Sequence, residues 1–244
     1  MKAFIFAAGL GTRLKPLTDR MPKALVPVGG KPLIWHVIRK LQKAGVDEFV
    51  INVHHFAELI SDYLELEDFF GSKIELSVEE DMPLETGGGL RKAAELLQGS
   101  GSFFAHNVDI ISNADLKAMA EEERPGALAT LLVSQRKTQR YLLFNRDMRL
   151  VGWTNVATGE VRSPFKDLRL EDCGKYAFAG IHYISEKILP LLQEMPERFS
   201  IMDFYIRNAA EFPIYGYAPQ GLEIVDAGKP ETLQRASQMI ELGQ

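Results

Sequence analysis

Hydrophobic and polar positions along the first half of the chain alternate in blocks that predict strands followed by helices. A continuous apolar run predicts a buried strand over residues 3–8, and residues 32–44 carry apolar side chains at helical spacing before a stop at Gly45. The same pattern predicts strands over residues 48–53, 74–78 and 102–106, with helices over residues 57–66 and 87–97. This alternation predicts an α/β fold, a single doubly wound, Rossmann-like, mainly parallel sheet with helices on both faces.

The second half of the chain has shorter blocks and more turn residues. Residues 128–133, 141–144 and 150–153 have the pattern of short, more exposed strands, whereas residues 177–184 form a strongly apolar strand. The remaining pattern predicts helices over residues 185–192, 202–210 and 230–242 and strands over residues 214–217 and 223–225. We therefore expect one continuous domain, 1–244, in which residues 142–175 form a small β insertion beside the main sheet.

Composition narrows the class of protein. The chain has 244 residues, of which 46% are hydrophobic and 25% charged, with a net charge of −5, so a basic nucleic-acid footprint is absent. A single cysteine, Cys173, excludes an internal disulfide and a cysteine-based zinc cluster. Arg13 and Lys15 interrupt the first apolar stretch, and no apolar run is long enough to span a membrane. We expect a cytoplasmic protein with neither nucleic-acid nor membrane partners; the sequence leaves its oligomeric state open.

The first 32 residues carry the strongest chemical signal. The apolar strand runs into a glycine turn, Gly9-Leu-Gly-Thr-Arg13, and a proline-bracketed Lys23 follows. Glycines let the backbone approach phosphates, N–H groups point at their oxygens, and the two cations supply charge. This combination favours a polyphosphate ligand.

Two better-known phosphate motifs are absent from this segment. Leu14 stands where the dinucleotide fingerprint requires its third glycine. Lys31 is followed by Pro32 instead of Ser or Thr, and Leu25 stands where a P-loop has its first glycine. The segment therefore belongs to a different class of phosphate site.

Two aspartates follow predicted strands and are candidate metal ligands. Asp109 ends the segment Asn107-Val-Asp109, and Asp226 lies in Val225-Asp-Ala-Gly228 before the last helix. Magnesium favours one or two carboxylates together with substrate phosphates and waters. Because ligands of doubly wound sheets bind outside the carboxyl ends of the strands, Asp109 and the glycine turn can converge on one site. Helix capping is the simpler alternative for either aspartate.

A run of glycines precedes the predicted helix 87–97. The segment reads Glu85-Thr-Gly-Gly-Gly89-Leu, and each glycine within a helix costs roughly 1 kcal/mol relative to alanine. The run is explained if a flat ligand lies against bare backbone, whereas a capping role explains only Thr86. The acidic residues 79–81 before it are expected to form a solvated loop.

Taken together, these residues resemble the family of sugar-1-phosphate nucleotidyltransferases that make nucleoside-diphosphate sugars. The resemblance rests on the block Ala7-Ala-Gly-Leu-Gly-Thr-Arg-Leu14 with Pro22-Lys-Ala-Leu-Val-Pro27, and on the order of the later segments around Glu85, Asp109 and Asp226. The short length and the Glu-Thr-Gly-Gly-Gly element are most similar to members that transfer UMP to N-acetylmuramate-1-phosphate or a related hexose-1-phosphate. The chain departs from the family at Val108 and Lys229, and it lacks the Glu-Lys-Pro of thymidylyltransferases.

The resemblance implies an enzyme that uses Mg²⁺, a nucleoside triphosphate and a sugar-1-phosphate. Arg13 and Lys23 would be catalytic, Asp109 and Asp226 would hold the metal, and Gly180, Lys175 and Asn155 would contact the sugar phosphate. The nucleotide-binding half would span about 1–110 and the sugar-phosphate-binding half about 111–244. The implied nucleotide site consists of Ala7, Ala8, Gly9, Leu10, Gly11, Thr12, Arg13, Lys23, Glu85, Thr86, Gly87, Gly88 and Asn107.

Other functions remain compatible with the same residues. The base and the sugar are not determined, so a mannose- or heptose-1-phosphate guanylyltransferase, a phosphocholine cytidylyltransferase or a molybdenum-cofactor-type enzyme is an alternative. A regulator that senses nucleotides or sugar phosphates could keep the fold without the chemistry. The intact pair of aspartates and Lys23 favour an enzyme.

Overall fold

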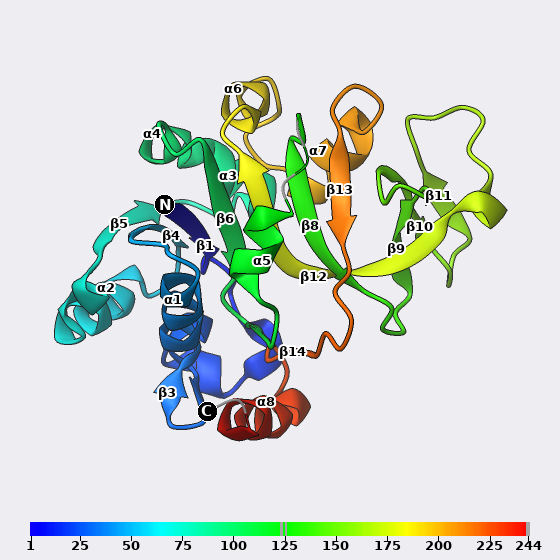
Figure 1. The fold of residues 1–244 in the computed structure, drawn as a ribbon. Helices are drawn as coiled ribbons and strands as arrows, with labels where there is room; N and C mark the ends of the chain where they lie inside the picture. The colour runs from blue at the N-terminus through cyan, green and yellow to red at the C-terminus, as the bar shows by residue number, and fades with distance from the viewer. Residues whose placement is uncertain (123, 125, 243–244) are drawn as a thin grey trace.

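The computed structural model describes residues 1–122, 124 and 126–242, and a ten-stranded sheet forms its core (Figure 1). The strand order is β11-β10-β9-β12-β6-β1-β4-β5, and β8 lies between β12 and β13. Strands β5, β4, β1 and β6 are parallel, β12 runs antiparallel to β6, and β8 is parallel to β13. The strands are β1 Lys2–Phe6, β4 Glu48–Val53, β5 Lys73–Val78, β6 Ser102–Asn107, β8 Ala129–Ser134, β9 Arg140–Phe144, β10 Leu150–Asn155, β11 Glu160–Arg162, β12 Gly174–Ser185 and β13 Ile214–Tyr217.

Helices cover both faces of this sheet because successive residues of each strand point to opposite faces. In β1, Ala3 and Ile5 pack into one apolar cluster and Phe4 into the other. The first cluster is covered by α1 Leu33–Lys43, α2 Ala57–Leu66, α5 Leu116–Glu121 and α8 Pro230–Leu242. The second is covered by α3 Glu85–Lys92, α4 Ala94–Leu97, α6 Ile188–Gln193 and α7 Ile201–Asn208. The doubly wound α/β fold expected from the sequence is confirmed.

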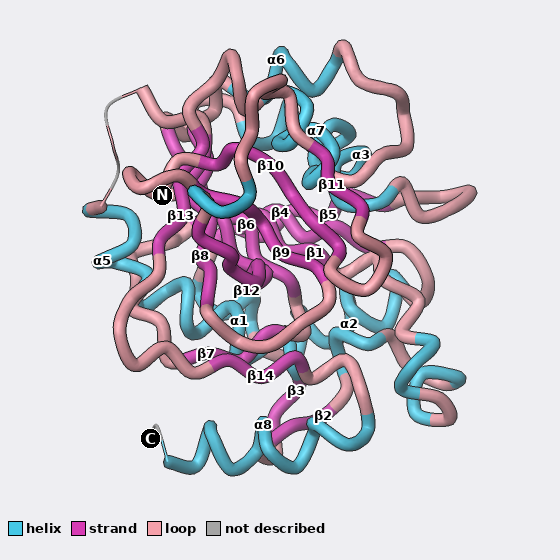
Figure 2. Tube along the Cα trace, turned by 90° about the vertical axis from the view of Figure 1, so that its right-hand side faces the viewer, coloured by secondary structure: helices cyan, strands magenta, loops and turns pink. Residues whose placement is uncertain are grey.

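Two short sheets hold the C-terminal segment in place. Strand β14 (Ile224–Asp226) pairs antiparallel with β7 (Ile110–Ser112), and Figure 2 shows the two side by side above α8. The hairpin of β2 (Pro27–Val28) and β3 (Lys31–Pro32) packs against α8, where the Gly29 backbone N–H donates to Ser237 Oγ at 3.1 Å. The C-terminal helix therefore lies against the N-terminal hairpin.

Several sequence-based boundaries and the predicted exposure of three strands were wrong. Residues 128–133, 141–144 and 150–153 were expected in more exposed strands. Strand β8 is instead buried through Val133, because it lies inside the sheet between β12 and β13. Residues 142–144 of β9 and 150–152 of β10 are buried as well. Ser185 ends β12 instead of beginning a helix, so α6 starts at Ile188. The helix expected over residues 87–97 is divided into α3 and α4, and α3 already begins at Glu85.

The predicted β insertion is present as an antiparallel extension of the same sheet. Strands β9, β10 and β11 pair in sequence, and residues Gly174–Tyr176 at the start of β12 pair with β9. Strand β12 is long enough to join this extension to β6 and β8. Figure 1 shows the extension as the right-hand part of the molecule.

No membrane-spanning candidate occurs among the described residues, since none of their helices combines the necessary length with the necessary hydrophobicity.

Two fully buried histidines lie on adjacent strands of the sheet. Burial is the main factor that lowers the pKa of both His106 and His182 to about 3. The Nδ1 atom of His182 lies 3.2 Å from the Tyr205 hydroxyl, which is itself buried. Both imidazoles are therefore neutral in the folded protein across the physiological pH range.

We predict that these histidines make the fold acid-sensitive. In the unfolded chain each histidine has a pKa of about 6.5, so it binds a proton below that pH, whereas the folded protein does not. The free energy of unfolding therefore falls as the pH falls from 6.5 towards 3. Between pH 7 and pH 5 the free energy of unfolding should fall by on the order of 2 kcal/mol for each imidazole. Urea unfolding at the two pH values measures this loss.

The double variant His182→Leu/Tyr205→Phe provides the control. It removes both hydrogen-bonding partners together, so neither polar group is left buried and unpaired. Its loss of stability between pH 7 and pH 5 should be clearly smaller than that of the wild type; an equal loss would contradict this role of His182.

Candidate active site

The glycine turn after β1 is fixed by contacts that require glycine at position 11. Gly11 has a φ of +63°, and a Cβ there would lie 2.8 Å from Thr18 Cγ2 and 3.2 Å from Lys23 Cβ. Its carbonyl accepts hydrogen bonds from the Leu14 N–H and from Thr18 Oγ1, both at 2.8 Å. The turn therefore packs directly on the segment that carries Lys23.

Lys23 and Asp109 form an ion pair at the carboxyl edge of the sheet. The Lys23 ammonium contacts Asp109 Oδ2, and each side chain is only 12% exposed. Asp109 follows β6, and its carbonyl accepts a hydrogen bond from the Ala227 N–H at 2.8 Å. Removing one member of such a pair leaves the other charge poorly compensated in a partly buried place.

Asp226 and Arg13 complete the cluster. Arg13 Nη1 lies 3.8 Å from Asp226 Oδ2, and Asp226 Oδ1 accepts a hydrogen bond from the Gly228 N–H at 2.8 Å. A Cβ at Gly228 would lie 2.7 Å from Asp226 Oδ1 and 2.9 Å from both Arg13 Nη2 and Asp109 Oδ2. Three of the four predicted catalytic and metal-binding side chains therefore surround one glycine, and the fourth, Lys23, contacts Asp109.

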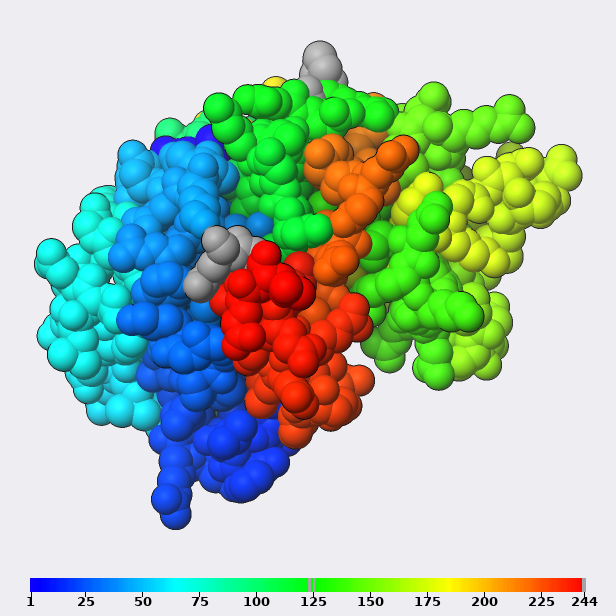
Figure 3. All heavy atoms as spheres, turned by 60° about the horizontal axis from the view of Figure 1, so that its bottom comes forward, coloured from blue at the N-terminus to red at the C-terminus, as the bar shows by residue number. Residues whose placement is uncertain are grey.

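Figure 3 views the molecule with this edge brought forward. The red C-terminal segment lies against the blue N-terminal residues, and the green and yellow-green residues of the β extension lie to one side. The contacts of Arg13 and Asp109 with the segment around Asp226 and Gly228 belong to this junction of N-terminal and C-terminal segments.

The donor set fits a magnesium ion shared with a substrate. Among the described residues, no group of three or more His, Cys, Asp or Glu side chains could hold a metal. Magnesium is commonly held by one or two carboxylates, with waters and substrate phosphates as its other ligands. Asp109 and Asp226, with Arg13 and Lys23 to balance phosphate charge, can provide such a site.

The structure gives the glycines at the start of α3 a different role from the expected one. The N–H groups of Gly87 and Gly88 donate to the Phe199 carbonyl at 2.9 and 3.2 Å. A Cβ at Gly87 would lie 2.2 Å from the Phe199 ring, and one at Gly88 would lie 2.3 Å from the Glu197 carbonyl oxygen. Close packing on residues 197–199 therefore explains Gly87 and Gly88 without a ligand, and their two N–H groups are not free to read a base.

Thr86 does not cap the helix that follows it, but contacts the segment that leads into α7. Its Oγ1 accepts a hydrogen bond from the Ile201 N–H at 3.0 Å. Arg198 Nε lies 3.2 Å from Glu85 Oε1. The segment that begins α3 is thus fastened to the chain that leads into α7, a link that the sequence pattern did not indicate.

Glu79 was expected in a solvated loop, but it is 2% exposed. Its Oε1 accepts a hydrogen bond from Asn52 Nδ2 at 2.7 Å, and its Oε2 accepts one from the Leu84 N–H at 2.8 Å. The Asn52 carbonyl in turn accepts from the Ala7 N–H at 2.9 Å. Glu79 therefore connects the N-terminal turn to the start of α3. The sequence did not indicate this role, because Glu79 is followed by two further acidic residues, a pattern typical of a solvated loop.

Of the expected sugar-side residues, Gly180 lies beside the cluster. It has a φ of +78° at the irregularity in β12, and a Cβ there would lie 2.6 Å from Ile110 Cγ1 and 3.0 Å from Asn107 Nδ2. Asn107 ends β6, two residues before Asp109. Gly180 and Asn107 therefore lie at the carboxyl edge that carries the aspartates.

Asn155 and Lys175 are separated by the β extension. Asn155 lines a cavity of about 510 Å³ together with Phe178 and Ser200, but Lys175 does not. Because side chains alternate along a strand, Lys175 and Phe178 point to opposite faces of β12. The structure therefore does not bring Lys175 to the hollow that contains Asn155.

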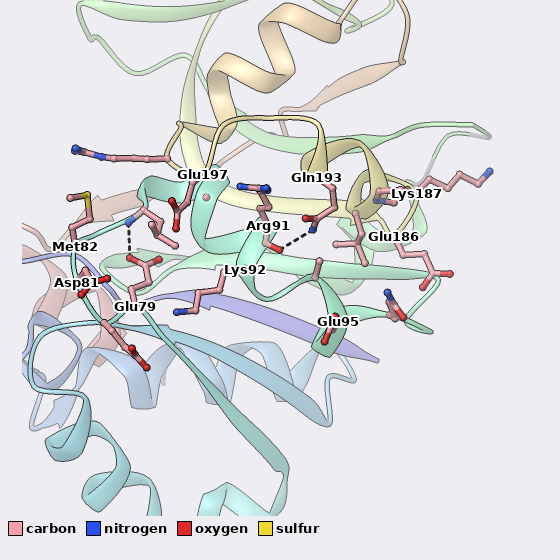
Figure 4. A pocket seen from close by; sticks show the side chains of 18 of the residues that line it. Glu79, Asp81, Met82, Arg91, Lys92, Glu95, Glu186, Lys187, Gln193 and Glu197 are labelled. Atoms are coloured by element: carbon pink, nitrogen blue, oxygen red, sulfur yellow. Dashed lines mark hydrogen bonds between the residues drawn. The ribbon is translucent and has the colours of Figure 1, made fainter.

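A larger cavity of about 1170 Å³ lies elsewhere, between α3, α4 and the start of α6. Figure 4 shows Arg91, Glu95 and Gln193 around it, with the hydrogen bond from Gln193 to the Arg91 carbonyl. Of the predicted site residues, only Gly88 lines it. Size alone therefore does not identify the active site in this fold.

Comparison with known proteins identifies relatives of this chain. Residues 2–144 match the family described as "Nucleotidyl transferase". The chain is 35% identical over 230 residues to an N-acetylmuramate alpha-1-phosphate uridylyltransferase of Caulobacter vibrioides, covering 90% of this chain and 89% of that protein. It is 30% identical over 241 residues to a mannose-1-phosphate guanyltransferase of Candida albicans, covering 95% of this chain and 62% of that protein.

The fold is also shared with solved structures. A UDP-glucose pyrophosphorylase complexed with UDP-glucose superposes with a TM-score of 0.79 at 18% identity, covering 100% of this chain and 99% of that chain. The family expected from the N-terminal residues is confirmed by the family match and by the Caulobacter relative. The family match spans more than half of the residues, and the chain covers 89% of the Caulobacter uridylyltransferase. The chain therefore belongs to the nucleotidyl transferase family.

Proposed function

We propose that the protein transfers a nucleoside monophosphate from a nucleoside triphosphate to a sugar-1-phosphate, releasing pyrophosphate and forming a nucleoside-diphosphate sugar. The substrates we favour are UTP and N-acetylmuramate-1-phosphate or a related hexose-1-phosphate. The observation that carries the proposal is the convergence of Arg13, Asp109 and Asp226 around Gly228, with Lys23 on Asp109. The similarity to the Caulobacter uridylyltransferase supports the choice of substrates.

The reaction needs no catalytic base. An oxygen of the sugar phosphate, already negatively charged at neutral pH, attacks the α-phosphorus in line. The new P–O bond forms as the bond to the bridging oxygen breaks, and pyrophosphate leaves with the electron pair. Catalysis then consists mainly of positioning and of stabilising charge.

Each charged residue of the cluster has a defined task in this proposal. Arg13 holds the leaving pyrophosphate, and Lys23 lies between the α-phosphate and the sugar phosphate. Asp109 and Asp226 hold Mg²⁺, which when bound neutralises phosphate charge. The Lys23 ammonium compensates Asp109 in the absence of substrate and would turn to the phosphates when they bind.

The proposal divides the chain into a nucleotide-binding half, about 1–110, and a sugar-phosphate-binding half, about 111–244. The turn from Ala7 to Arg13 and Asn107 belong to the first half. Glu85 and Thr86 remain the candidates for contacts to the base, whereas Gly87 and Gly88 hold that segment in place through Phe199. Gly180 and Asn155 are the sugar-side candidates.

A mannose-1-phosphate guanylyltransferase is the second candidate, favoured by the 30% identity to the Candida enzyme over 95% of this chain. The proposed cluster is equally suited to either acceptor, because it contacts only phosphates. The difference between the candidates lies in the base and the sugar, so a substrate panel separates them. A regulator that only senses these ligands would bind them without releasing pyrophosphate.

We predict that pyrophosphate release depends on the cluster. Purified protein is assayed with UTP, CTP, GTP and dTTP, each crossed with a panel of sugar-1-phosphates and phosphocholine, in the presence of Mg²⁺. Release with one pair should identify the substrates, and Asp109→Asn should abolish it. Lys23→Met should lower turnover by roughly a hundredfold, because a donor to the transition state is lost.

Thermal melting is the control for these variants. Asp109→Asn and Lys23→Met should still melt cooperatively, so that the loss is one of chemistry. If no pair releases pyrophosphate although a triphosphate binds tightly, the regulator replaces the enzyme; normal turnover by Lys23→Met removes Lys23 from the mechanism.

We also predict that Gly228→Ala inactivates the protein without unfolding it. The added methyl group would lie within 3 Å of Arg13, Asp109 and Asp226 oxygen or nitrogen atoms, so those side chains must move apart. Turnover should fall by at least roughly tenfold, as expected when positioned groups are displaced. Gly71→Asn is the control: the added Cβ meets open space at a φ of +68°, which asparagine tolerates, so this variant should retain turnover. Full turnover by Gly228→Ala would show that catalysis does not require the close approach of Arg13, Asp109 and Asp226, and would contradict the prediction.

A further inference from the structure

A hollow beside the proposed phosphate site has features that the transfer reaction does not explain. It has a volume of about 510 Å³ and lies between the β extension and α7. Phe178 lines it and stands two residues before Gly180, a separation of about 7 Å along a strand. Ser200 lines it as well and directly follows Phe199, which binds the start of α3. The hollow is therefore within reach of a substrate that has its phosphate at Asp109.

The walls of the hollow suit a sugar ring. Trp153, Phe178 and Met202 offer apolar and aromatic surface, while Asn155 and Ser200 bring polar groups. Such a combination accommodates a molecule that has both C–H faces and hydroxyl groups. The hollow therefore fits the part of a hexose-1-phosphate that extends away from its phosphate.

The charge of the hollow is the unusual feature. Arg162 is compensated, because its Nε lies 2.7 Å from Glu160 Oε1 and its Nη1 lies 3.3 Å from Asp203 Oδ1. Its guanidinium also stacks over the Trp153 ring, 5.0 Å from the centroid. This network uses both of the carboxylates that line the hollow.

Two further arginines, Arg136 and Arg140, line the same hollow. Neither makes an ion pair with a carboxylate of the part of the chain that the structure describes. Arg136 Nη2 donates to the Phe178 carbonyl at 3.2 Å, which holds its guanidinium at the hollow and leaves its other N–H groups available. Arg140 stands opposite Asn155 in the β9–β10 pairing. Three arginines thus face two carboxylates, and the hollow has an excess of positive charge.

We propose that Arg136 and Arg140 bind a carboxylate carried by the sugar, so that the protein selects acidic hexose-1-phosphates over neutral ones. The planar guanidinium group binds a carboxylate through two parallel hydrogen bonds, which gives direction as well as attraction. The 1-phosphate itself is assigned to Lys23, so the arginines are left for a second anionic group on the ring. This inference rests on the proposed function and names the class of its acceptor.

Two substrates that differ only in the acidic group provide the test. N-acetylmuramate-1-phosphate carries a lactyl carboxylate on the ring, and N-acetylglucosamine-1-phosphate has the same ring without it. We expect the wild type to have a kcat/KM at least tenfold higher for the acidic sugar. Arg136→Met and Arg140→Met should each lower that value tenfold to a hundredfold, mainly through KM, and leave the neutral sugar within threefold.

Lys137→Met is the matched control, because Lys137 belongs to the same loop but does not line the hollow. It should leave both substrates unchanged. Arg140→Lys keeps the charge but loses the fork geometry, so it should restore only part of the preference. Both arginines are exposed, so none of these variants should alter the melting temperature appreciably.

Each alternative result has a distinct meaning. An equal fall for both sugars would show that the arginines bind the shared 1-phosphate and would overturn the inference. Turnover without a preference for the acidic sugar would also overturn it and leave the nucleotidyl transfer intact. If no sugar-1-phosphate of the panel is turned over with any triphosphate, the proposed function fails, and calorimetric titration of the same two sugar phosphates into wild type and Arg140→Met still decides whether the arginines recognise the carboxylate.

Discussion

The antiparallel pairing of β14 with β7 is the constraint on which the proposed site depends. It places Asp226 opposite Ile110, directly after Asp109, and it positions the Ala227 N–H to donate to the Asp109 carbonyl. Two carboxylates far apart in the sequence thereby come together, although like charges repel. Arg13 beside Asp226 and Lys23 on Asp109 offset that repulsion. The charge cluster is therefore complete only when the C-terminal segment is paired with β7.

A second set of contacts connects the two sides of the site. The Phe199 carbonyl accepts from Gly87 and Gly88, and the Ile201 N–H donates to Thr86 Oγ1. The same stretch continues through Ser200 into the hollow beside α7. Residues 199–201 thus contact both the segment proposed to lie near the base and the hollow proposed to hold the sugar. This shared backbone fixes the distance between the two. Buried Glu79 performs the equivalent task towards the N-terminal turn through Asn52.

The distribution of charge gives this acidic protein its local affinity for anions. The net charge is −5, yet the proposed phosphate site combines two cations with two carboxylates, and the neighbouring hollow has more arginines than carboxylates. Local arrangement, and not net charge, decides what a site can bind, because electrostatic interactions between exposed charges decay within about a Debye length of roughly 10 Å. The two regions are thus suited to different anionic groups of one substrate.

The sequence by itself determined the doubly wound fold, the order of its elements and the family, because apolar periodicity and the glycine–arginine–lysine block are local patterns. It also indicated Asp109 and Asp226 as a pair, since both follow strands. Only the tertiary structure decided that β8 is buried and that Gly87 and Gly88 pack against residues 197–199. It also decided that Glu79 is buried and hydrogen-bonded, and that Lys175 points away from Asn155. Each of these features depends on contacts between segments that are far apart in the sequence. A strand or a glycine has the same local sequence pattern whether solvent, a ligand or a distant part of the chain covers it.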